Sequence, residues 1–74
     1  MSKKLIRLKS PKIEDLQNFV GRDLDFVLKN GIVYFGVLKK IEGDQLFFSD
    51  KINNKHIITF GDLQEVVADE IHQF

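Results

Sequence analysis

Cationic and aromatic side chains offer the clearest capacity for chemistry in this sequence. The first 40 residues carry nine lysines and arginines against four acidic residues, although the 74-residue chain has a formal net charge of zero. Such cations bind phosphate by releasing counterions, and aromatic rings provide surfaces on which nucleobases stack. The same charges can instead keep an N-terminal arm solvated. The cations considered as phosphate contacts are Lys3, Lys4, Arg7, Lys9, Lys39, Lys40 and Lys55.

Catalytic chemistry finds little support in the residue types. The chain has two histidines and no cysteine, and it contains neither a glycine-rich phosphate loop nor a cluster with metal-ligand spacing. The carboxylates near the C-terminus occupy positions typical of surface charges. We therefore expect no enzyme activity, no catalytic residue, no metal site and no cofactor.

Length and hydropathy place the chain in a narrow class. A single domain of 74 residues buries only about 60% of the surface that its unfolded chain exposes, so it is marginally stable alone. Without cysteine there is no disulfide to add stability, which favours oligomerisation. No stretch resembles a signal peptide or approaches the roughly 20 apolar residues of a membrane span. The expectation is a cytoplasmic homo-oligomer that has no membrane partner.

The elements that position these side chains begin with a hairpin. Asn30-Gly31 lies between two apolar runs, which is the strongest short-range hairpin signal. A two-residue turn at this dipeptide predicts that Phe26 faces Phe35, and it leaves apolar side chains on both faces. A core must then cover one face, and a helix or another chain the other. One face would hold Leu24, Phe26, Leu28, Val33, Phe35 and Val37.

Turn and capping signals divide the rest of the chain. Residues 1–9 form a basic arm, whose interleaved apolar residues could dock it as an extra strand. Ser10 as N-cap and Pro11 predict a helix to about Val20, ended by Gly21. Five short strands follow. The predicted fold is mainly β, with an N-terminal helix followed by a five-stranded, strongly bent antiparallel sheet forming a small barrel; the barrel domain spans residues 10–69, and residues 70–74 form a tail.

The order of elements and the residues of the first hairpin resemble the Sm and Sm-like family. The family's first motif reads here as Gly21, Leu24, Phe26, Leu28-Lys29-Asn30-Gly31, Tyr34, Gly36, Leu38 and Glu42. The resemblance extends from about residue 11 to 69. It implies an SH3-like or Sm-like barrel, single-stranded RNA as ligand, and a ring closed by pairing the fourth strand (residues 55–60) of one subunit with the fifth (residues 64–68) of the next.

The second motif of the family matches only in its apolar positions. Thr59 and Phe60 stand where the family has Arg-Gly, and an arginine plane that stacks on a base cannot be replaced by threonine. The resemblance thus implies a uridine pocket that is altered or absent, with Glu42, Asp44 and Gln45 at the turn that would border it.

The bacterial Hfq branch of the family offers a second comparison. Its Lys-His pair resembles Lys55-His56, although such a pair at a strand start is also typical of a solvated strand end. Its purine-binding face corresponds to Gly31, Ile32 and Tyr34. Tyr34 could stack on a base, or it could pack against a helix or a subunit.

Two functions therefore remain open. The leading hypothesis is an Sm-like RNA-binding protein that forms a homo-oligomeric ring. The alternative is a protein-interaction or scaffolding module on the same barrel without nucleic acid, which the zero net charge and the acidic C-terminal half favour.

Overall fold

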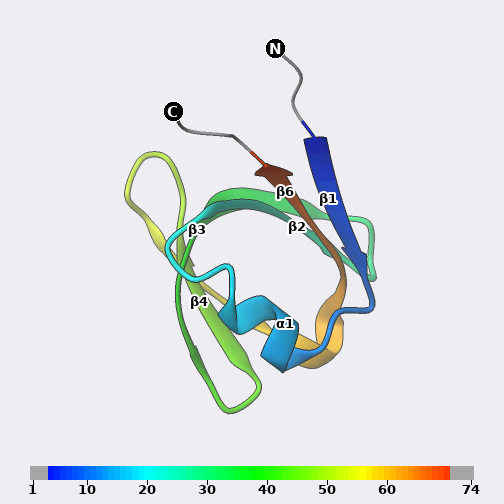
Figure 1. Cartoon of the computed structure of the whole chain (residues 1–74). Helices are drawn as coiled ribbons and strands as arrows, with labels where there is room; N and C mark the ends of the chain where they lie inside the picture. Colours follow the sequence, from blue (N-terminus) through cyan, green and yellow to red (C-terminus); the bar gives the residue numbers. More distant parts are fainter. Residues whose placement is uncertain (1–3, 71–74) are drawn as a thin grey trace.

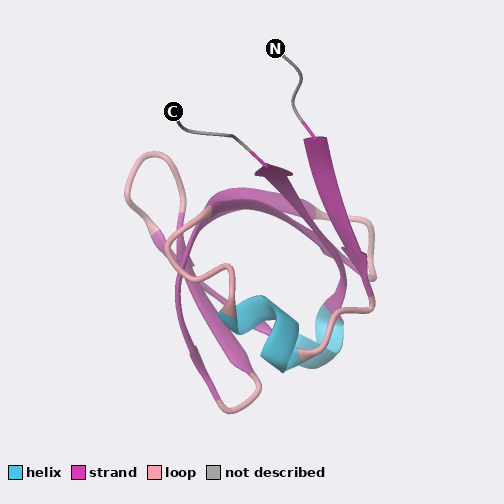
Figure 2. Ribbon diagram, in the orientation of Figure 1, coloured by secondary structure: helices cyan, strands magenta, loops and turns pink. Residues whose placement is uncertain are grey.

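Six antiparallel strands form one sheet in the order β1-β6-β2-β3-β4-β5, in a computed structural model that describes residues 4–70. Figure 1 shows the sheet curling around its own interior, with the short helix α1 at the lower side of the curl. The edge strands β1 and β5 are not hydrogen-bonded to each other, so the sheet is not closed. Figure 2 shows how strands dominate the fold. The elements are β1 (Lys4–Lys9), α1 (Ile13–Gln17), β2 (Asp23–Leu28), β3 (Val33–Glu42), β4 (Gln45–Ser49), β5 (Lys55–Thr59), a 3₁₀ turn (Phe60–Asp62) and β6 (Leu63–Glu70).

The prediction of a mainly β fold is confirmed, but the number of strands differs. The basic arm contributes β1, which pairs with β6 from Lys4 opposite Glu70 to Lys9 opposite Glu65. β6 is therefore hydrogen-bonded on both edges, to β1 and to β2. Residues 1–3 and 71–74, including Lys3 and most of the predicted tail, lie outside the described residues.

The helix is shorter than the sequence suggested. Ser10 has φ +47° and does not cap the helix. The N-cap is Lys12, whose backbone N–H donates to the Asp15 carboxylate at 3.2 Å. Leu16 is fully buried, so one helical turn suffices to fix α1 against the sheet.

The predicted register of the first hairpin is wrong by one residue. Phe26 lies opposite Tyr34, and Asp25 lies opposite Phe35. The cause is a three-residue loop in which Gly31 has φ +90°, whereas a two-residue type I′ turn would also require a positive φ at Asn30. The Leu28 N–H donates to the Ile32 carbonyl and closes this loop. Because strand side chains alternate, the shift turns Phe35 to the outer face.

The core fills the concave side of the sheet and closes against α1. The Phe26 and Phe48 rings lie 4.6 Å apart at its centre. Gly36 allows close strand contact, since a Cβ there would collide with the Ser49 carbonyl oxygen. The buried apolar residues are Leu16, Leu24, Phe26, Leu38, Leu46, Phe48, Ile58, Leu63, Val66 and Ala68.

Candidate functional site

A cavity of about 550 Å³ opens on the outer side of β3, β4 and β5. We call it the lysine cavity, because three exposed lysines line it. Two of them are consecutive residues of β3, and the third is the first residue of β5. Four residues predicted from the sequence come together here: Lys39, Lys40, Lys55 and His56. The remaining lining residues are Phe47, Phe48, Ser49 and Ile57.

The strand register explains how polar and apolar groups alternate in the lysine cavity. Lys40 lies opposite Phe47, and Phe47 lies opposite Ile57, so the three side chains form one row across the outer face. The Lys40 Nζ lies 4.8 Å from the centroid of the Phe47 ring. Ile57 is 58% exposed. The row therefore offers a cation, an aromatic ring and an aliphatic side chain side by side.

A β-bulge places two consecutive lysines at this cavity. The pairing of β3 with β4 shifts between Leu38 and Lys40, which leaves Lys39 as an extra residue. Both lysines are exposed. Without the bulge, Lys39 and Lys40 would point to opposite faces of the sheet.

The lysines differ in their ionic partners. The Lys40 Nζ lies 3.1 Å from a Glu42 carboxylate oxygen, in a pair whose two side chains are both more than half exposed. Among residues 4–70, Lys39 and Lys55 make no ion pair. The cavity thus presents a net positive charge to a ligand.

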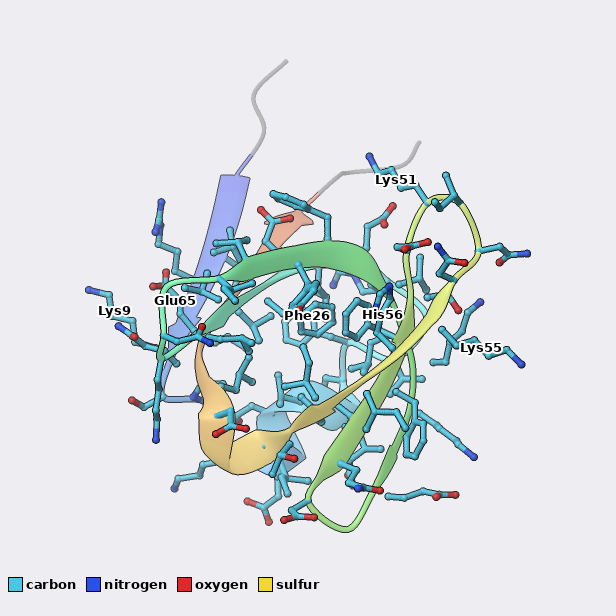
Figure 3. All side chains as sticks on the ribbon, turned by 180° about the vertical axis from the view of Figure 1, so that it is seen from behind. Lys9, Phe26, Lys51, Lys55, His56 and Glu65 are labelled. Carbon is cyan, nitrogen blue, oxygen red and sulfur yellow. The ribbon has the colours of Figure 1, made fainter. Side chains whose placement is uncertain are left out.

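His56 lies between the lysine cavity and the core. In Figure 3, Lys55 points away from the sheet whereas His56 points inward, on the same side as Phe26. The His56 ring stacks on Phe48, with centroids 5.0 Å apart. Its Nε2 lies 2.9 Å from an Asp50 carboxylate oxygen.

Asp50 organises the loop between β4 and β5. Its Oδ1 accepts hydrogen bonds from the backbone N–H groups of Ile52 and Asn54. The hydrogen bond with His56, followed by that from Asn54, lowers the pKa of Asp50 below its ordinary value. The sequence gives no signal for this pair, because Asp50 and His56 are six residues apart and become neighbours only through the loop.

A smaller cavity of about 180 Å³ adjoins the other side of His56 and includes Tyr34. The half-buried Tyr34 ring lies 5.8 Å from Phe48 and 5.7 Å from His56. Tyr34 thus packs against strand residues of its own chain rather than against the helix, and its role in stacking on a base stays a prediction. Thr59 and Asp62 also line this cavity.

The other predicted residues lie elsewhere. Gly31 and Ile32 are in the exposed β2–β3 loop. Glu42 does not line the lysine cavity but forms an ion pair with Lys40, which does. Asp44 and Gln45 lie at the β3–β4 turn. There the Asp44 carbonyl accepts a hydrogen bond from the Phe60 N–H.

The basic arm lies at the far edge of the sheet. Arg7 pairs with Glu65 at 3.0 Å, and Lys9 lies close by, as Figure 3 shows. Lys4 belongs to the same strand. The structure thus separates the predicted contacts that it describes into the lysine cavity, the smaller cavity at Tyr34, two loops and β1.

Four lining residues of the cavity were not predicted from the sequence as site residues: Phe47, Phe48, Ser49 and Ile57. Phe47 lies inside the continuous apolar run Leu46-Phe47-Phe48, a pattern that is also typical of a fully buried strand. Strict alternation along β4 was the signal that could have separated Phe47 from its neighbours.

Within residues 4–70, no cluster of three histidine, cysteine or acidic side chains could hold a metal ion. No helix in the same part of the chain is long and apolar enough to cross a membrane. Comparison with family models, with curated proteins and with solved structures found no match.

Proposed function

We propose that the protein binds single-stranded RNA at the lysine cavity. The observation that carries this proposal is the row of Lys40, Phe47 and Ile57 with Lys39 and Lys55 beside it. Lysines can hold the phosphates of a single strand, while a base packs on Phe47 and Ile57. The volume falls within the range of about 300–1,000 Å³ that is typical of ligand sites.

The chemistry of the cavity favours a binder that tolerates different sequences. Its exposed floor is aromatic and aliphatic, and any base has a face that can stack on such a floor. The cations read the backbone rather than the base edges. The contact between Asp50 and the His56 Nε2 occupies one of the two ring nitrogens of His56, which leaves fewer groups to read a base edge.

An SH3-like or Sm-like barrel is our proposal for the finer description of the fold. Supporting it are the helix α1 directly before β2 and the strand order β6-β2-β3-β4-β5, in which β6, the last strand of the chain, returns to pair with β2. Thr59 and Phe60 in place of Arg-Gly support an altered or absent uridine pocket.

A ring closed by pairing of β5 with β6 of the next subunit stays a prediction. In the structure, such pairing would need a free edge on β6. Both edges of β6 are already paired within the chain. Such a ring would require β1 to leave β6.

Fluorescence anisotropy with labelled A-rich and U-rich RNA oligonucleotides tests the RNA proposal. The triple variant K39Q/K40Q/K55Q should bind more weakly and show a shallower salt dependence, by about 0.7 in the log-log slope for each lost phosphate contact. The control K12Q/K29Q/K51Q removes equal charge at exposed lysines outside the cavity. Equal loss in both variants would indicate non-specific attraction instead.

A protein-interaction module is the second candidate. The observation that favours it is an exposed apolar pair on the outer face of β3, Val33 and Phe35, which are 40% and 56% exposed. Wild-type protein that binds neither RNA would remove the first proposal and leave this one.

A further inference from the structure

In the connection between β1 and α1, the fold imposes a backbone conformation that the local sequence disfavours. Ser10 adopts φ +47°, in the left-handed region that residues other than glycine rarely occupy. The next residue is Pro11, and a residue before proline prefers an extended backbone. Ser10 is thus held in a bent conformation that its own sequence context disfavours.

β1 depends on a single neighbouring strand. It pairs along its whole length with β6, and its Arg7 makes an ion pair with Glu65 of that strand. Ile6 and Leu8 pack against the core. The β6 and core of a second copy would offer the same set of contacts.

We propose that β1 exchanges between two copies of the chain, giving a dimer in which each β1 pairs with the partner's β6. Extending the backbone at Ser10 directs β1 away from its own β6 and towards that of the second copy. The monomer and the exchanged dimer contain the same β1–β6 pairing, so they differ mainly at the hinge and in the entropy of association. Relief of the unfavourable Ser10 conformation in both chains favours the dimer.

This exchange is independent of RNA binding. β1 and β5 lie at opposite ends of the strand order, and the lysine cavity contains no residue of β1. The exchanged dimer also keeps both edges of β6 paired, which distinguishes it from the ring.

Variants at Ser10 and Pro11 test whether the backbone conformation of the hinge favours the dimer. Glycine adopts a positive φ freely, so Ser10→Gly should stabilise the monomer and raise the dimer dissociation constant about tenfold or more. Pro11→Ala removes the restriction on Ser10 and should act in the same direction. Asn53→Gly is the matched control, because Asn53 is the other non-glycine residue with positive φ among residues 4–70 and lies in the distant β4–β5 loop. Light scattering after size exclusion, over a concentration series, measures all four proteins.

Engineered cysteines test the geometry. Arg7 lies opposite Val67, and the chain has no native cysteine. In the R7C/V67C variant, the isolated dimer should oxidise to a covalently linked dimer, while the isolated monomer should form only an intrachain bond. The single variant R7C serves as the control for contacts between two β1 edges.

Three results would overturn the proposal. The first is a wild-type protein that stays monomeric at its highest soluble concentration. The second is a dimer whose R7C/V67C bonds are intrachain. The third is a dimer population that Ser10→Gly and Asn53→Gly change equally.

Discussion

Phe47 and Phe48 are neighbours of the same residue type on β4, yet the structure gives them opposite environments. Phe48 is 1% exposed and contacts Phe26, Tyr34 and His56 in the core. Phe47 faces outward beneath the Lys40 ammonium. The inner face of this sheet therefore supplies stability, and the outer face of β3, β4 and β5 supplies the candidate binding surface.

The largest expected difference between the two faces is in stability. Phe48→Ala should lower the free energy of unfolding by about 3–5 kcal/mol, because it leaves a cavity in the core. Phe47→Ala should lower the free energy of unfolding by less than half of that amount. Urea denaturation of both variants measures the difference, and equal losses would contradict the separation of the two faces.

The close approach of β3 and β4 gives a second test of the inner face. Gly36→Ala should destabilise the protein by about 1–3 kcal/mol or more, since the new methyl group meets the Ser49 backbone and lies 2.8 Å from the Phe48 ring. Gly61→Ala is the control, because its Cβ would meet no atom within 4 Å. Thermal unfolding should show a lower midpoint for the first variant and little change for the second.

Substitutions on the outer face should change the affinity for RNA more than the stability of the fold. Phe47→Ala should weaken RNA binding by about 1–3 kcal/mol if one base stacks on the ring. Phe47→Tyr keeps an aromatic surface and should retain most of the affinity. Anisotropy titrations compare the two variants, and equal affinities would remove stacking from the account.

The smallest expected effect is on the stability of the loop between β4 and β5, which Asp50 organises. Because the hydrogen bonds lower the pKa of Asp50 in the folded state, its contribution to stability is complete above the ordinary pKa of about 4 and is lost as the pH falls through the folded-state value. Asp50→Asn should therefore be less stable than wild type at neutral pH, with the difference shrinking below pH 4. Urea midpoints across this range measure the difference, and a constant gap would argue against a role for the charge.

Much of the architecture follows from local sequence signals. Asn30-Gly31 correctly indicated a hairpin, and the apolar run Leu46-Phe47-Phe48 lies in β4. The register did not follow, because Asn-Gly suits both a two-residue and a three-residue loop. The two loops differ at Asn30, which would need a positive φ in the two-residue turn; in the loop that forms, Gly31 has a positive φ and Asn30 does not.

The candidate site was predictable in part. The sequence proposed Lys39, Lys40, Lys55 and His56, which line one cavity, but the bulge that brings Lys39 and Lys40 to it depends on how β3 pairs with β4. The interleaved apolar residues of the basic arm raised the possibility of an extra strand but not its partner β6, which lies about 60 residues further along the chain. Contacts between distant segments decided both outcomes.

The most direct test of the central claim is an NMR titration of ¹⁵N-labelled protein with single-stranded RNA. We expect the largest amide shift changes at Lys39, Lys40, Phe47 and Lys55 and at the residues beside them. Changes centred on β1 or on the Gly31 loop, or no changes at all, would contradict it.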